Sequence, residues 1–281
     1  MQDKTIVVTG GTSGIGEVAA VELAKQGARI VLVARDAERA EATLRKLRHA
    51  NPAANPVAHM ADLSRLSEMR RVAKEIGDEE PEIDVLINNA GALFGSRQAA
   101  EGGLEMTFAL NHMSYFVMTN ILLPNLKATK NARIVSTASD AHNGAKLDFD
   151  DLQSARKYSG FSVYGKSKLC NILFTRELAR RIAGTGVTAN CLHPGFVATR
   201  FGDLSGGIMS VAVRIAKPIG AISPAQGAKT IIYLATSSDV AGKSGGYYYK
   251  NKLAVPSAEA QNDADAQRLW EISAKISGVG A

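Results

Sequence analysis

The chain of 281 residues contains only two cysteines, Cys170 and Cys191. Two cysteines cannot form a disulfide framework, and these two have neither the number nor the spacing of zinc ligands. Because unpaired cysteine is among the residues most often buried, we expect both thiols to lie inside the folded protein. The histidines are also scattered, and we predict no metal site from His49, His59, His112, His142 and His193.

Long apolar runs are missing too. The longest, Ile30–Ala34 and Ile231–Ala235, have five residues each, whereas a membrane-spanning helix needs about 20. The chain begins Met-Gln-Asp-Lys and enters a strand-like pattern at once, which leaves no room for a signal peptide. With 46% hydrophobic and 21% charged residues, the composition is that of a globular protein rather than a disordered one. We therefore expect a cytoplasmic protein without a transmembrane segment.

Positive charge is in slight excess but is not concentrated. Lys and Arg number 33 and Asp and Glu 27, so the net charge is +6. The densest basic cluster comprises Arg45, Lys46 and Arg48. Glu41 lies four residues before Arg45, as in a helical ion pair, and no interleaved aromatic residues or nucleic-acid-binding motif accompany the cluster. We interpret it as a solvated helix face and predict no nucleic-acid partner.

Short β-branched runs alternate with longer helical patterns, as in βαβ units with a parallel sheet. Most predicted strands are apolar on both sides, which is expected where helices cover both faces of a sheet. No repeat or linker divides the chain, so we predict one domain over 1–281 with an α/β, Rossmann-like, doubly wound fold. The predicted strands are Lys4–Thr9, Arg29–Ala34, Pro56–Met60, Ile83–Asn88, Arg133–Ala138, Val187–Leu192 and Gly245–Lys250, and the predicted helices cover about 14–26, 36–50, 65–77, 104–129, 160–183, 224–237 and 262–276.

A glycine-rich segment, TGGTSGIG at 9–16, follows the first predicted strand and leads into a helical pattern. Glycine allows a tight turn close to a pyrophosphate, and the N-terminus of the following helix offers free N–H groups to the anion. An isolated glycine-rich loop could be an ordinary strand-to-helix turn, but here the strand, loop and helix occur in the required order. The segment therefore predicts a dinucleotide site whose residues are Gly10, Thr12, Ser13, Gly14, Ile15 and Gly16.

The end of the second predicted strand bears on which dinucleotide binds. Asp36 lies at about the distance where an acidic residue would accept hydrogen bonds from a ribose. It also opens the next helix, and we interpret it as an N-cap. Arg35 would then face a 2′-phosphate, for which a guanidinium supplies charge and paired donors, although it could also be a surface arginine. This arrangement predicts NADP(H) as the cofactor.

Tyr164 and Lys168 lie one turn apart in a predicted helix. A nearby ammonium favours the phenolate, so we expect Lys168 to lower the pKa of Tyr164, and a depression of about two or three units would make it a useful proton donor. Taken alone, such a pair is usually a packed ring beside a solvated amine. Ser139 lies just past the fifth predicted strand, at the edge where open α/β sheets bind ligands. A serine-rich turn is the simpler alternative there.

These motifs resemble those of the short-chain dehydrogenase/reductase family along almost the whole chain. TGGTSGIG is similar to the family's TGxxxGxG loop, Asn88–Gly91 to its NNAG segment, and Tyr164 with Lys168 to its YxxxK pair. PGFVAT at 194–199 resembles its PGxVxT segment. The resemblance implies a catalytic tetrad of Asn111, Ser139, Tyr164 and Lys168. It also implies that Asp62 contacts the adenine and that Thr199 contacts the nicotinamide carboxamide. The other residues that the resemblance implies for cofactor binding are Leu63, Asn89, Ala90, Gly91, Tyr164, Lys168, Pro194, Gly195 and Val197.

A closer resemblance is to the retinol dehydrogenase-like branch, which includes the WW-domain-containing oxidoreductase. Its matching stretches are RIVSTASDAH, FSVYGKSKLCNILFTRELARR and RLWEIS. Ser139 and Tyr164 lie 25 positions apart, about twice the usual family separation, but the branch shares the inserted stretch 143–160. The resemblance also suggests a homo-oligomer formed through the helices near 104–129 and 160–183, one of whose contacts the insertion could obstruct.

The leading hypothesis is an NADP-dependent oxidoreductase in which Tyr164 is the general acid for an apolar aldehyde, ketone or alcohol. The preference for apolar substrates rests on the stretch 196–222, predicted to be a flexible lid with many apolar residues, and on Leu93 and Phe94 as a second apolar wall. The same spacing would suit an ordinary amphipathic helix. Two alternatives are a non-catalytic NADP-binding redox sensor and a light-driven reductase of the protochlorophyllide type.

Overall fold

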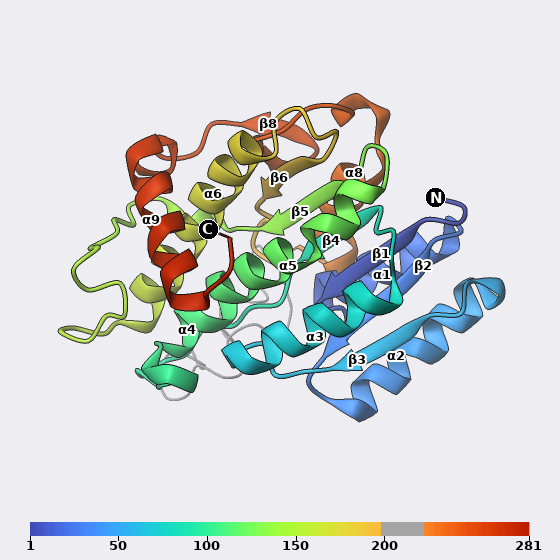
Figure 1. Ribbon diagram of the computed structural model, residues 1–281, viewed down its shortest axis with the longest axis horizontal. Helices are drawn as coiled ribbons and strands as arrows, with labels where there is room; N and C mark the ends of the chain where they lie inside the picture. Colours follow the sequence, from blue (N-terminus) through green and yellow to red (C-terminus); the bar gives the residue numbers. More distant parts are fainter. Residues whose placement is uncertain (198–221, 281) are drawn as a thin grey trace.

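A computed structural model of the protein describes residues 1–197 and 222–280 (Figure 1). The described strands form one sheet, in the order β3-β2-β1-β4-β5-β6-β7-β8. All neighbours pair in parallel except β7 and β8, which pair antiparallel. The strands are β1 (Thr5–Thr9), β2 (Arg29–Ala34), β3 (Val57–Met60), β4 (Val85–Asn88), β5 (Arg133–Thr137), β6 (Thr188–Leu192), β7 (Tyr247–Tyr249) and β8 (Lys252–Ala254).

Helices cover both faces of this sheet, as predicted. They are α1 (Gly14–Lys25), α2 (Ala37–Ala50), α3 (Leu66–Glu79), α4 (Met106–Phe108), α5 (Ser114–Ala128), α6 (Gly160–Arg181), α8 (Pro224–Thr236) and α9 (Asp263–Ser277). Short 3-10 turns occur at Pro52–Ala54, Glu101–Gly103, Asp140–His142, Ser238–Val240 and Glu259–Gln261. No helix within the described ranges is both long and apolar enough to cross a bilayer.

Successive residues of β1 point into two separate cores. Ile6 and Val8 pack with residues of α1, α2 and α8. Val7 packs on the opposite side with residues of α3, α5 and α6. Strands β1, β2, β4 and β5 contribute buried residues to both cores, which is why their apolar runs show no polar alternation, whereas the edge strand β3 is only partly buried.

The C-terminal helix α9 lies against α6 (Figure 1). Its Trp270 stacks on Phe174, with ring centroids 5.9 Å apart, and packs edge-on against Phe116 at 4.8 Å. Ser273 on the same helix bonds to the buried His112 through atoms 2.8 Å apart. This contact covers part of α5 and α6, the helices through which the family resemblance suggested a homo-oligomer.

Two local features differ from the expected pattern. The last predicted strand, Gly245–Lys250, is only β7, and it turns through Lys250 and Asn251 into the unexpected antiparallel β8. Both turn residues have positive φ, and Lys-Asn is not one of the glycine-containing pairs that announce such a hairpin. The long helix predicted over 104–129 is divided into α4, a π-helical turn at Ala109–Met113, and α5.

Candidate active site

Most of the predicted cofactor residues follow the carboxyl ends of strands β1 to β6, whereas Asn111, Tyr164 and Lys168 lie on helices. Because these strands are parallel, the loops after them lie at one edge of the sheet. β1 pairs with both β2 and β4. The strands that follow β1 therefore extend the sheet first on one side of β1, through β2 and β3, and then on the other, from β4 onward. Ligands of open α/β sheets bind at such a switch point. The topology therefore brings the glycine loop, NNAG and the Ser139 segment to the same edge.

The glycine loop passes very close to the backbone after β4. Gly10 has φ +67°, and a Cβ there would lie 2.8 Å from the Cα of Ala90. A Cβ on Gly16 would lie 2.3 Å from the carbonyl oxygen of Gly10. Ser13 caps α1 without a side-chain hydrogen bond, so its side chain does not occupy the N–H groups of the first turn. Those groups and the closely approaching glycines fit a pyrophosphate.

Hydrogen bonds join the ends of three strands beside this loop. The Thr9 hydroxyl accepts from the backbone N–H groups of Asn89 and Ala90, at 3.0 and 3.1 Å. The Asn89 amide donates to the carbonyl of Gly10 at 3.1 Å and accepts from the Thr137 hydroxyl at 3.3 Å. Asn89 therefore holds β1, β4 and β5 together at the cofactor edge. Thr9 and Thr137 were not predicted as site residues, although both lie in the motifs that located the site.

The residues predicted to lie at the adenine end, Arg35 and Asp36, are exposed to solvent. Asp36 accepts a hydrogen bond from the backbone N–H of Arg39 at 3.0 Å, so the N-cap prediction is confirmed. Arg35 follows β2 directly and is exposed. Asp62 uses one oxygen to accept from the N–H and the hydroxyl of Ser64, at 3.0 and 2.8 Å, and Leu63 beside it is buried.

Tyr164 and Ser139 meet through a side-chain hydrogen bond. The inserted stretch between them therefore does not separate them in space. The Ser139 hydroxyl also accepts from the N–H of Ala141 at 3.2 Å, which fixes its orientation. Tyr164 is a buried residue of α6. The structure thus brings the predicted phenol and serine into direct contact.

Lys168 lies one helical turn further along α6 and is 3% exposed. Its Nζ donates to the carbonyl oxygen of Thr137 at 3.0 Å and lies 5.6 Å from the centre of the Tyr164 ring. Burial lowers the pKa of Lys168 to about 7. Burial also raises the pKa of Tyr164 well above its usual value, while the bond from Ser139 lowers it in part.

These shifts correct the expectation that the Lys168 ammonium lowers the pKa of Tyr164 in the protein alone. Taking both groups out of water disfavours each charged form, the phenolate and the ammonium alike. Neighbouring residues in the sequence give the spacing of the pair but not its burial. Near neutral pH the cofactor-free phenol therefore stays protonated, whereas the amine is close to the midpoint of its titration.

Asn111 lies in the π-helical turn between α4 and α5. Its amide donates to the carbonyl of Ala92 at 2.9 Å and to the Ser167 hydroxyl at 3.0 Å, and its oxygen accepts from the Ala92 N–H at 2.8 Å. A Cβ on Gly91 would lie 3.1 Å from the Asn111 oxygen and 3.5 Å from Lys168 Nζ. Asn111 and Lys168 therefore both lie close to Gly91 of the NNAG segment.

The segment after β6 is described only in part. Pro194 and Gly195 continue from the strand, with φ +89° at Gly195. Val197 then forms a parallel bridge with Ile222. Thr199 and most of the predicted lid at 196–222 lie outside the described residues.

The inserted stretch at 143–160 packs on the loop that follows NNAG. The Tyr158 hydroxyl donates to the carbonyl of Phe94 at 3.1 Å. It also bonds at 3.3 Å to the buried carboxylate of Glu105, which caps α4. Gly160 lies so close to Phe94 that a Cβ would come within 2.4 Å of its carbonyl oxygen. The insertion therefore fixes the predicted apolar wall against the start of α6.

The remaining titratable candidates have structural contacts. Both nitrogens of His142 are occupied, by the Ser139 carbonyl at 2.7 Å and by the Ser257 N–H at 3.1 Å, so it holds the Ser139 turn. Cys170 and Cys191 are buried as predicted, and burial raises the pKa of each thiol to about 12. Within 1–197 and 222–280, no group of three or more His, Cys, Asp or Glu side chains could hold a metal ion.

Comparisons with known proteins agree with this arrangement. A family model described as short chain dehydrogenase matches residues 4–205. Retinol dehydrogenase 13 from Homo sapiens is 39% identical over 285 residues, which cover 99% of this chain and 86% of that protein. The crystal structure of an uncharacterised protein from Mycobacterium paratuberculosis is 30% identical with a TM-score of 0.79, covering 99% and 94% of the two chains. RhlG from Pseudomonas aeruginosa, solved as an NADP active-site complex, is 27% identical with a TM-score of 0.69, covering 92% and 97%.

Proposed function

We propose that this chain, which belongs to the short-chain dehydrogenase family, is an NADP(H)-dependent oxidoreductase of apolar carbonyl compounds and alcohols. Its membership makes it an oxidoreductase that acts on alcohol or carbonyl groups with a nicotinamide cofactor. The observation that carries the finer proposal is the convergence of Ser139, Tyr164 and Lys168 at the sheet edge beside the glycine loop. A pure cofactor sensor has no need of a buried phenol held by a serine one turn from a lysine.

The cofactor residues form two groups in this proposal. The loop Gly10–Gly16 and the N-terminus of α1 would hold the pyrophosphate. Asp62 and Leu63 would line the adenine, and Arg35 would pair with a 2′-phosphate. Asn89, Ala90 and Gly91, with Pro194, Gly195, Val197 and Thr199, would hold the nicotinamide half. The exposed guanidinium of Arg35 and the occupied carboxylate of Asp36 support NADP(H), as does the NADP complex named for RhlG.

A bound nicotinamide supplies hydride to a carbonyl carbon or accepts it from an alcohol. Side chains of the protein supply or accept the proton. In reduction, the Tyr164 hydroxyl donates it to the carbonyl oxygen, and Ser139 donates a hydrogen bond to the same oxygen. Because burial keeps Tyr164 protonated, it is ready to act as the acid. Lys168 lies behind the ring, where an ammonium would stabilise the phenolate that remains, and Asn111 holds the NNAG backbone beside it.

Apolar side chains near Tyr164 support an apolar substrate. Leu93 and Phe94 follow NNAG as buried residues that the insertion holds in place. Phe161 lies one turn before Tyr164 in α6 and is 57% exposed, and Phe196 directly after Gly195 is 51% exposed. Single exposed aromatic residues are common, but two of them beside catalytic motifs fit a pocket with few polar groups. The name of retinol dehydrogenase 13 points to the same class of ligand.

The experiment is NADPH consumption with unbranched aldehydes of increasing length, with NADH as the cofactor control. Burying each CH₂ contributes about 0.8 kcal/mol, so kcat/KM should rise up to about fourfold per methylene until the pocket is full. A flat or falling series from the shortest aldehyde would contradict the apolar pocket. NADPH binding without turnover of any carbonyl would favour the redox sensor, and turnover only under illumination would favour the light-driven reductase.

A further inference from the structure

Three side chains converge on one backbone oxygen next to the proposed acid. The carbonyl of Thr137, at the end of β5, accepts from Lys168 Nζ at 3.0 Å, from Asn171 Nδ2 at 3.2 Å and from the Tyr115 hydroxyl at 3.5 Å. A carbonyl oxygen has two lone pairs, so three donors exceed its ordinary capacity. The donors therefore compete for the same oxygen.

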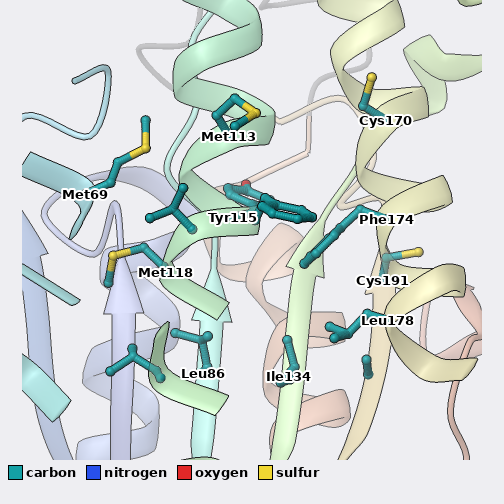
Figure 2. Packing of buried hydrophobic residues seen from close by; sticks show 14 of the residues in the cluster. Met69, Leu86, Met113, Tyr115, Met118, Ile134, Cys170, Phe174, Leu178 and Cys191 are labelled. Atoms are coloured by element: carbon teal, nitrogen blue, oxygen red, sulfur yellow. The ribbon is translucent and has the colours of Figure 1, made fainter. Parts of the chain in front are cut away.

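All three donors are buried, and they come from two helices. Tyr115 belongs to α5, whereas Lys168 and Asn171 lie one turn apart on α6. Figure 2 shows the ring of Tyr115 extending from α5 toward Phe174 on α6, above the sheet. Lys168 Nζ lies 5.7 Å from the centre of the Tyr115 ring and 5.6 Å from that of Tyr164. The amine is thus enclosed by two phenol rings and the end of β5.

We propose that Tyr115 and Asn171 are positioning residues that hold Lys168 for catalysis through the shared carbonyl of Thr137, an inference that rests on the proposed function. Their bonds tie the end of β5 to α5 and α6, so the point to which Nζ is anchored cannot shift. They also donate to the same carbonyl oxygen as Lys168, which weakens the hydrogen bond between Lys168 Nζ and that oxygen. Lys168 keeps donors for other acceptors because an ammonium has three N–H bonds.

This arrangement predicts how each variant acts. Tyr115→Phe retains the ring and removes only the hydroxyl, whereas Asn171→Leu keeps a similar volume and removes the amide. Either change removes a competing donor, so the carbonyl of Thr137 accepts a stronger hydrogen bond from Lys168. That bond favours the ammonium, and the pKa of Lys168 should rise. A neutral hydrogen bond corresponds to a change of about twofold to tenfold in proton affinity. Turnover should fall by a similar factor, because without one of these bonds the end of β5 is tied less firmly to α5 or α6 and the anchor of Nζ can shift.

The test is a 13C NMR titration of the lysine Cε signals in the cofactor-free protein, with Lys168→Arg to assign the signal. The titratable groups that face the amine in the described parts of the chain are Tyr115 from α5 and Tyr164 from α6. Burial lowers the pKa of the amine, which brings its titration into an accessible pH range. Two matched controls are Tyr247→Phe, which removes a buried hydroxyl elsewhere, and Asn125→Leu, which removes an amide bonded to the carbonyls of Gly77 and Glu80.

The expected result is a raised Lys168 midpoint and a lowered kcat in Tyr115→Phe and Asn171→Leu, with no change of the midpoint in either control. If one variant fails to fold, the other still decides the matter. An unchanged midpoint in the folded variants would overturn the inference, as would an equal shift in Asn125→Leu, because the role would then be structural. Absence of turnover in the unmodified protein would contradict the proposed function alone, since the titration does not require turnover.

Discussion

The two ends of the proposed cofactor site differ in their contact with water. At the adenine end, Arg35 and Asp36 are exposed, and Asp36 serves to begin a helix. At the nicotinamide end, Tyr164, Lys168 and Asn111 are buried, and each has hydrogen-bonded or ring contacts within the protein. Charge in water gives modest, salt-sensitive selectivity, whereas burial changes proton affinities by several powers of ten. In the proposed site, cofactor choice would therefore depend on charges that water screens, and proton transfer on groups that the protein shields from water.

The largest effect is expected at the buried end. Tyr164→Phe should reduce turnover by about 10²–10⁴-fold, the range for losing a positioned general acid. NADPH affinity should stay within about twofold, because the ring and its packing remain. Steady-state kinetics and NADPH fluorescence titration measure the two quantities. If Tyr164→Phe kept most of its turnover under conditions where chemistry limits the rate, Tyr164 could not be the general acid.

At the exposed end, Arg35→Asp should lower the preference for NADPH over NADH by about one to two powers of ten, because a charge-assisted pair contributes about 1.5–3 kcal/mol. Arg39→Ala is a control that removes a neighbouring exposed cation. Raising the salt concentration should also weaken the preference of the unmodified protein. Equal NADH and NADPH affinities before any substitution would contradict the role of Arg35.

Burial of Lys168 also predicts a pH-dependent stability. Its pKa is about 7 in the folded protein and 10.5 in the reference state, so between these values the unfolded chain binds more protons. The free energy of unfolding contributed by this group must therefore rise with pH, by up to about 1.4 kcal/mol per pH unit. Urea unfolding from pH 7 to 8.5 should show this slope in the cofactor-free protein relative to Lys168→Met. Parallel stability curves for the two proteins would mean that Lys168 is not buried as described.

The smallest expected effect concerns the exposed N-cap. Asp36→Ala should lower the free energy of unfolding by about 1 kcal/mol through the loss of the bond from the Arg39 N–H. The NADPH preference should change little, because the carboxylate belongs to the helix rather than to the ribose. Asp36→Asn retains a capping oxygen and is the matched control. A marked gain or loss of NADH affinity in Asp36→Ala would contradict this prediction, because it would mean that Asp36 contacts the cofactor.

The sequence predicted most of the fold, because strands and helices follow from local patterns. The residues of the candidate site came from motifs and from the family resemblance, and their roles stay predictions. The β-branched runs produced β1 to β6, and the spacing of Tyr164 and Lys168 placed them on one face of α6. The proton affinities did not follow, since they depend on α5 and α6 closing around the pair. The convergence of three donors on the Thr137 carbonyl could not be predicted either, because a backbone oxygen is present at every residue and gives no sequence signal. The hairpin to β8 was missed because Lys250 and Asn251 are unusual residues for its turn.

The most direct test of the account is the fate of the hydride and the proton in a single turnover. Purified protein would react with NADPH deuterated at the transferable position of C4 and with a long-chain aldehyde, and the alcohol would be analysed by mass spectrometry. The account predicts one deuterium on the former carbonyl carbon with the unmodified protein, and almost no labelled alcohol with Tyr164→Phe despite normal NADPH binding. Unlabelled alcohol, or equal labelled product from both proteins, would contradict it.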